Sequence, residues 1–313
     1  MICRRGTTRP ILFFPSNISR YPMSALQFQL TPKKRHTERT NMHYQRTFPV
    51  STVAPKAWSA ICQLLGGASR INPGASTWKD SFIVNLGTPA GHNKIVKPQS
   101  LYSWHCDGDF FVHYLDSPEQ ALLVIPLWTD VVPGGGGTLM VPSAIPAVVN
   151  RLYEHPEGCS PGMTLRREDE TFDRSTRLKW YNDLIKTMPD SAFVEATGVV
   201  GDVYLLHPWM VHSASNNMLR RARVITNPKV SLVEPFCFDR EDGNYSLVER
   251  MTLKVLGKER LEGWKITRER EVIITKRLEV QMEINRAEEE RLRKMGAKVE
   301  EAKEKMDVVV AIA

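Results

Sequence analysis

The hydrophobic positions of this chain change their spacing along its length. From Pro55 to Leu65 they recur at helical intervals and stop at Gly66-Gly67, which predicts a helix with a glycine end. Hydrophobic residues then gather in short runs bounded by Gly or Pro, and these runs predict strands at 81–86, 102–105, 121–128, 138–141, 201–207 and 222–226. The 121–128 run is continuously apolar, as in a strand buried on both faces. This order indicates an antiparallel sandwich or barrel, and a double-sheet jelly roll fits it best.

Two stretches outside the strands have helical spacing. An insert at about 144–195 places Tyr181, Leu184, Ile185 and Met188 at helical intervals. It either shapes access to a site on the barrel rim or packs outside the barrel, and the pattern leaves both interpretations open. From 246 to 313 the chain is helical and strongly charged, with opposite charges four residues apart, as in Glu290/Lys294. We interpret it as a solvated tail helix; its apolar spacing would also suit a homodimer.

The pattern therefore divides the chain into three parts. Residues 47–245 form the mainly β domain with its insert, and 246–313 form the helical extension. Residues 1–46 hold nine Lys or Arg against one acid, Glu38, and show no sustained period. We interpret them as a disordered tail or as residues that precede the true start, with Met23 as a candidate start. Their basic, acid-poor composition is also weakly similar to a mitochondrial transit peptide.

Composition narrows the class of protein. The chain has 313 residues of which 42% are hydrophobic, enough for a sizeable core. Its five cysteines include no C-x-x-C pair, so the sequence predicts neither a disulfide framework nor a thiolate zinc site, and we expect a reducing, cytoplasmic setting. The net charge of +7 is spread out and lacks interleaved aromatic residues, so no nucleic-acid partner is predicted. No apolar run approaches the ~20 residues that span a bilayer, so we expect no membrane partner.

The candidate chemistry lies at the ends of two predicted strands. His105 and Asp107 stand two residues apart, so their side chains project to the same side and can converge on one ion. Two imidazoles and one carboxylate are the ligands that hold one face of a non-haem Fe(II). His207 and His212 are both candidates for the second imidazole. Arg223 follows on the next strand, and its planar guanidinium matches the carboxylate of a 2-oxo acid.

These residues carry a resemblance to a known family. Trp104-His-Cys-Asp107, then Gly201-Asp-Val-Tyr-Leu-Leu-His207-Pro-x-x-x-His212, then Asn217 and Arg223, resemble the phytanoyl-CoA dioxygenase family over roughly residues 80–230. The resemblance implies a double-stranded β-helix and an Fe(II)- and 2-oxoglutarate-dependent dioxygenase. It makes His105, Asp107 and His212 the metal ligands and catalytic centre, and it selects His212 over His207. Arg223 would bind the C5 carboxylate of 2-oxoglutarate.

The resemblance also has weaker implications. Asn217, Trp128 and Thr138 would contact the co-substrate, whereas Pro142-Ser-Ala-Ile145 stands where many members have Pro-Gly-Ser-His, so that histidine has no counterpart. The implied reaction uses O2 to hydroxylate, desaturate or cyclise a small molecule, in secondary or lipid metabolism. A non-catalytic, cupin-like protein that binds a metal or ligand is the alternative. The substrate itself is not specified by these residues.

Several further residues receive structural interpretations. Gly134 to Gly137 precede neither Lys-Ser/Thr nor a helix start, so we interpret them as a turn and not as a phosphate cradle. Cys106 lies between two ligands, and strand alternation points it away from the ion. Asp109 lacks the two-residue spacing to His105 that Asp107 has. His113 and His155 are interpreted as surface or packing residues.

Overall fold

The structure is a computed structural model, and it describes residues 2–3, 39–41, 46–165, 168 and 178–273, with helical residues at 279, 283, 286–287, 290–291 and 293–296. Side chains are described from residue 46 onward. The chain forms two compact units: the first comprises 1–108 and 113–269, and the second comprises 109–112 and 270–313. Most of the basic segment 1–46 therefore lies outside the described residues. All the elements that position the candidate ligands belong to the first unit.

The described elements are short and mostly strands. The strands are β1 (Ile2–Cys3), β2 (Arg39–Asn41), β3 (Thr47–Pro49), β4 (Thr77–Lys79), β5 (Ile83–Asn85), β6 (Leu122–Pro126), β7 (Thr138–Val141), β8 (Val194–Glu195), β9 (Val203–Leu206), β10 (Val211–Ala214), β11 (Arg223–Ile225) and β12 (Lys229–Val230). The helices are α1 (Val50–Val53), α2 (Pro55–Leu65), α3 (Ile145–Glu154), α4 (Lys179–Lys186) and α5 (Leu247–Val255). The protein is mainly β with few helices, as the hydrophobic pattern predicts.

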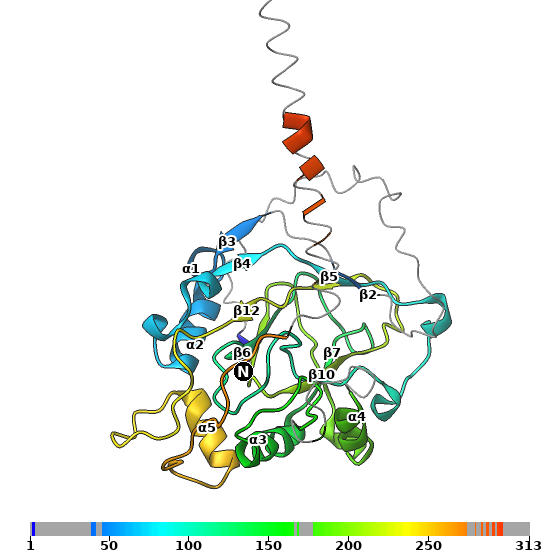
Figure 1. Ribbon diagram of the computed structural model, residues 1–313. Coiled ribbons are helices and arrows are strands. Elements are labelled where there is room, and N and C mark those ends of the chain that lie inside the picture. The colour runs from blue at the N-terminus through cyan, green and yellow to red at the C-terminus, as the bar shows by residue number, and fades with distance from the viewer. Residues whose placement is uncertain are drawn as a thin grey trace, which may run out of the picture. The chain divides into compact units, whose positions relative to one another are not determined.

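All of the strand pairings among the described residues are antiparallel, and three of the sheets matter for the site (Figure 1). One sheet has the order β1-β9-β6-β12, and Leu127, just after β6, forms a bridge to Ile225 on β11. Through that bridge the first sheet meets the sheet β11-β5-β2. Another sheet has the order β10-β7-β8 and is extended by a bridge from His105 to His212.

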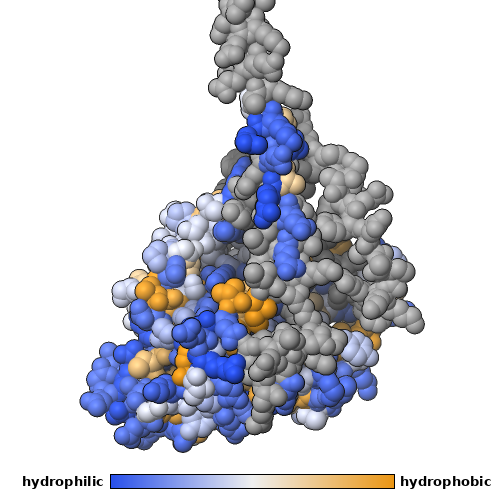
Figure 2. All heavy atoms as spheres, in the orientation of Figure 1, coloured by the Kyte–Doolittle hydropathy of each residue, from blue (hydrophilic) through white to orange (hydrophobic). Residues whose placement is uncertain are grey.

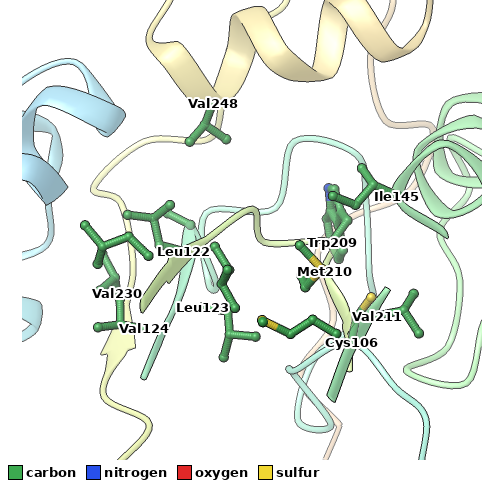
Figure 3. Close-up of a cluster of buried hydrophobic side chains, with 14 of the residues drawn as sticks. Cys106, Leu122, Leu123, Val124, Ile145, Trp209, Met210, Val211, Val230 and Val248 are labelled. Atoms are coloured by element: carbon green, nitrogen blue, oxygen red, sulfur yellow. The ribbon is translucent and has the colours of Figure 1, made fainter. Parts of the chain in front are cut away.

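The core is built around β6, whose five residues are all buried. This is the continuous apolar run that predicts a strand covered on both faces. Figure 3 shows Leu122, Leu123 and Val124 of this strand in one hydrophobic cluster with Val230 and Val248. Burying a large aliphatic side chain contributes roughly 1.5–3 kcal/mol relative to exposing it, so this strand anchors the first unit.

The helices of the insert bury one apolar face each. α3 buries Val148, Val149 and Leu152, and α4 buries Tyr181 and Ile185. Helix α3 lies next to α5, as Figure 1 also shows. Both interpretations of the insert stay predictions, and residues 169–177 lie outside the described residues.

Helix α5 belongs to the first unit, which runs on to Glu269 past the division at 245/246 expected from the charge pattern. Its N-terminus is a capping box in which Ser246 and Glu249 exchange hydrogen bonds. The Glu249 carboxylate is fully buried, and it accepts bonds of 3.0 and 2.7 Å from the Arg70 guanidinium. A charged sequence pattern does not show such pairing, because Arg70 lies 179 residues away along the chain.

The surface and the tail add little to the functional argument. In the tail, Glu290 and Lys294 form the expected ion pair at 2.8 Å, whereas the pairs 289/293 and 301/305 involve residues outside those described. Figure 2 shows a mostly hydrophilic face on which hydrophobic residues form small separate patches. Among the described helices, none combines the length and the apolar character that a bilayer crossing requires.

Candidate metal centre

His105 and His212 lie directly opposite each other on two antiparallel segments. The His105 amide donates to the His212 carbonyl oxygen at 3.1 Å, and the His212 amide donates to the His105 carbonyl oxygen at 3.0 Å. Directly opposed residues of an antiparallel pair project to the same face. The two imidazole rings are therefore neighbours, with centroids 4.4 Å apart. Residues that are 107 positions apart in the chain thus form one half of the site.

Each imidazole is oriented by a bond to the main chain. Nδ1 of His105 lies 2.6 Å from the carbonyl oxygen of Ser103, and Nδ1 of His212 lies 3.0 Å from that of Met210. A carbonyl oxygen only accepts, so Nδ1 carries the proton in both rings and Nε2 presents its lone pair. This is the arrangement by which metal-ligating histidines are commonly held, because the second nitrogen fixes both the tautomer and the ring orientation.

Asp107 closes the triangle. Its Oδ1 lies 3.5 Å from Nε2 of His105 and 3.5 Å from Nε2 of His212. One ligand atom from each of the three residues lies within 4.8 Å of the others, and this is the group of potential metal-binding side chains found in the described part of the chain. The other carboxylate oxygen, Oδ2, accepts a 2.6 Å hydrogen bond from Nδ2 of Asn227. The two oxygens of Asp107 therefore have different roles.

The charges of the group suit a cation. Burial would raise the pKa of Asp107, but the two neighbouring histidines outweigh it and hold the pKa well below the usual range. Burial, together with the neighbouring His212, lowers the pKa of His105, which favours its neutral form. An ionised carboxylate and a neutral imidazole are the protonation states that bind a metal.

The donor set fits a divalent transition metal. Ligand atoms about 2.1 Å from an ion, at right angles to one another, lie about 3 Å apart, close to the 3.5 Å separations of the group. Two imidazoles and a carboxylate on one side leave the other side open, which is the arrangement associated with non-haem Fe(II). The two imidazole ligands differ in solvent exposure: 30% of the His105 side chain is exposed, but only 8% of the His212 side chain.

His207, the other candidate for the second imidazole, is occupied elsewhere. Its Nδ1 accepts from the Trp209 amide at 3.2 Å, and its Nε2 lies 3.0 Å from Oγ1 of Thr252 on α5. Burial lowers the pKa of His207 to about 4, so the ring is neutral. It packs α5 against the end of β9 and is not one of the three grouped residues.

Arg223 and Thr138 lie near the leading end of β7. Arg223 is buried, and its Nε donates to the carbonyl oxygen of Gly136 at 2.8 Å. Thr138 is two residues before Met140, which is the residue opposite His212. It therefore lies on the same face as His212, about 7 Å along the strand. Arg223 therefore contacts the chain just before β7, and His212 pairs with Met140 further along the same strand.

Trp128 and Asn217 make structural bonds in the places where the structure puts them. The Trp128 indole donates to Oγ1 of Thr226 at 3.0 Å and stands edge-on to Phe82. The Asn217 amide is fully buried and donates to the carbonyl oxygens of Asn85 and Arg221 at 2.9 and 2.6 Å. A contact of either residue with a co-substrate stays a prediction.

Two residues at the site were not identified from the sequence. Asn227, which bonds Asp107, stands four positions after Arg223 and belongs to no recognised motif. His113 is fully buried, unlike a surface histidine, and its Nε2 lies 2.7 Å from the carbonyl oxygen of Gly108 in the ligand loop. Its place two residues after the strand that begins at Arg223 is the signal that could have suggested Asn227.

The two structural interpretations made from the sequence agree with the contacts. Figure 3 shows Cys106 in the apolar cluster near Trp209, Met210 and Val211, and the grouped ligands do not include it. The amides of Gly134 and Gly137 both donate to the Glu195 carboxylate at 2.9 Å. The Glu195 carboxylate thus accepts the hydrogen bonds of amides that, in a phosphate-binding loop, would be donated to the phosphate.

Comparisons with known proteins identify no family for the chain. No family model matches it, and no curated protein matches it either. Among solved structures, the chain is similar to the crystal structure of HygX from Streptomyces hygroscopicus with nickel and 2-oxoglutarate bound. That similarity has a TM-score of 0.33 and 12% sequence identity, and it covers 65% of this chain and 72% of HygX. The function of this protein therefore has to be argued from its own residues.

Proposed function

We propose that this protein is an Fe(II)- and 2-oxoglutarate-dependent dioxygenase that oxidises a small molecule. The observation that carries the proposal is the convergence of Nε2 of His105, Nε2 of His212 and Oδ1 of Asp107, with both Nδ1 atoms bonded to carbonyl oxygens. The arrangement of the sheets supports the proposal. The sheet that contains β6 is bridged to the sheet that contains β11, the sheet of β10 and β7 is separate from both, and a double-stranded β-helix likewise has two antiparallel sheets.

The chain's own residues would divide the work as follows. His105, Asp107 and His212 hold the metal ion, and bound Fe(II) together with 2-oxoglutarate supplies the activation of O2 for oxidation of a C–H bond. Arg223 binds the distal carboxylate of 2-oxoglutarate, because a buried guanidinium near Thr138 is suited to a carboxylate. Thr138 lies between Arg223 and the metal ligands and would line the co-substrate's path.

The test is an anaerobic titration of the protein with Fe(II) and 2-oxoglutarate, followed by the weak visible charge-transfer band of the ternary complex. We expect the band in the unmodified protein. In Arg223→Lys we expect it to need about 10–150 times more 2-oxoglutarate, since a bond to a charged group contributes roughly 1.5–3 kcal/mol. The exposed Arg221 offers a matched control, and Arg221→Lys should titrate like the unmodified protein.

Two results would count against the proposal. Absence of the band in the unmodified protein at saturating Fe(II) would contradict the dioxygenase and favour the non-catalytic, cupin-like alternative. A band that titrates identically in Arg223→Lys would contradict the role of Arg223 alone. Release of succinate from 2-oxoglutarate in air would support turnover, and this measurement does not require that the oxidised substrate is known.

A further inference from the structure

The second oxygen of Asp107 is held by a residue outside the ligand set. Oδ1 faces both imidazoles at 3.5 Å, whereas Oδ2 accepts a 2.6 Å bond from Nδ2 of Asn227. A carboxylate that is free to rotate can offer a metal ion either one oxygen or both. Here one oxygen is engaged by an amide that can only donate to it in this orientation.

The backbone that carries Asn227 is itself fixed. Asn227 lies two residues after β11, and β11 is bonded to the segment after β6: the Trp128 amide donates to the Val224 carbonyl oxygen at 2.9 Å. The Val224 amide donates to Oγ1 of Thr129 at 3.0 Å, and the Trp128 indole donates to Thr226, the residue next to Asn227. The amide of Asn227 therefore approaches Asp107 from an anchored strand end.

We infer that Asn227 is a positioning residue that restricts Asp107 to binding the metal through Oδ1 alone. The inference rests on the proposed function and deepens it. An ion with six coordination positions that accepts one atom from each of three side chains keeps three positions for the co-substrate and reactant. If Asp107 bound through both oxygens, one of those positions would be lost. Partners that orient a ligand in this way typically account for 10–100-fold in metal affinity.

The segment Arg223–Asn227 would then serve both halves of the centre. Arg223, the first residue of the segment, is the proposed anchor of the co-substrate, and Asn227, its last residue, orients a metal ligand. Arg223 is buried, whereas Asn227 is exposed at the surface of the first unit. An exposed asparagine can be replaced without opening a cavity in the core, so its substitution is expected to leave the fold intact.

The experiment measures Fe(II) binding anaerobically in Asn227→Ala and Asn227→Asp. Asn227→Ala removes the donor, and Asn227→Asp keeps the shape but places a second carboxylate against Oδ2. We expect Fe(II) to bind Asn227→Ala about 10–100-fold more weakly. We also expect the charge-transfer band with 2-oxoglutarate to shift in position, which a purely structural role would not cause. Asn244, exposed in the turn before α5, provides the matched controls Asn244→Ala and Asn244→Asp.

The outcomes separate this inference from the proposed function. If the unmodified protein binds Fe(II) and forms the band while both Asn227 variants stay within threefold of its affinity and show an unshifted band, the inference is wrong and the dioxygenase stands. If the unmodified protein binds no Fe(II), both are overturned. Thermal unfolding of the metal-free variants, expected to match that of the unmodified protein, shows that weaker binding is not due to misfolding.

Discussion

The half-buried ring of His207 should make the protein sensitive to acid. Burial lowers its pKa from 6.5 to about 4, so the folded state resists a proton that the unfolded state accepts. Because the pKa is lowered on folding, acid reduces the free energy of unfolding. This loss is absent at neutral pH, grows as the pH falls through 6.5 and is complete below about 4. The Nδ1 atom of His207 accepts from the Trp209 amide, so the added proton would go to Nδ1 and break that bond, whereas Nε2 would still donate to Thr252 on α5.

The size of the effect follows from the two pKa values. Between pH 7 and pH 5 the full shift would cost about 1.8 kcal/mol of unfolding free energy. Because the side chain is only partly buried, solvent screening reduces this, and we expect about 1 kcal/mol. His207→Gln removes the titrating group but keeps an amide near the position of Nε2. Between pH 7 and pH 5 its unfolding free energy should therefore fall by about 1 kcal/mol less than that of the unmodified protein.

The assay is urea unfolding of the metal-free protein at pH 7 and pH 5, for the unmodified chain and for His207→Gln. His105 and His212 are present in both proteins, so any contribution from them cancels in the comparison. His92→Gln, at an exposed position before the ligand strand, serves as the matched control and should behave like the unmodified protein. An equal loss of stability in the unmodified protein and in His207→Gln would refute the reasoning.

Three further substitutions test the contacts that hold the site in place. Glu249→Gln breaks the ion pair between the buried Glu249 carboxylate and the partly exposed Arg70 guanidinium and should cost about 1.5–3 kcal/mol in urea unfolding, whereas an unchanged midpoint would contradict that role. Glu195→Gln leaves at most one carbonyl acceptor for the two glycine amides of the turn before β7, and it should cost about 1–2 kcal/mol in the same assay; no loss would show that the turn is held by other contacts. Trp128→Phe loses the bond to Thr226 and should weaken Fe(II) binding a few-fold if that bond anchors the strand end beside Asp107, whereas unchanged affinity would argue against the anchor.

Much of the fold could be predicted because its strands are short runs with clear ends. The expected strands at 138–141 and 222–226 match β7 and β11 closely, and helix 55–65 ends where Gly66 adopts a φ of 85°. The place of α5 could not be predicted, because its charged surface resembles that of a tail helix. What holds it in the first unit is a buried carboxylate whose partner is far away in the sequence.

The candidate site was predictable to the extent that its residues follow spacing rules. His105 and Asp107 share a face because they are two residues apart, and His212 joins them as the motif implied. Spacing gives no information on Asn227 or on the carbonyl oxygens that orient the imidazoles. Those contacts depend on how β10 meets the segment around His105 and on where β11 ends; at His105 the structure has a single bridge to His212 in place of the strand expected at 102–105.

The most direct test of the account is the stoichiometry of Fe(II) binding under anaerobic conditions, measured by equilibrium dialysis with metal analysis. We predict one ion per chain in the unmodified protein. His212→Ala and Asp107→Ala should each abolish stoichiometric binding, while His207→Ala should retain it. Binding that persists in both ligand variants, or no binding in the unmodified protein, would contradict the claim that His105, Asp107 and His212 form a metal centre.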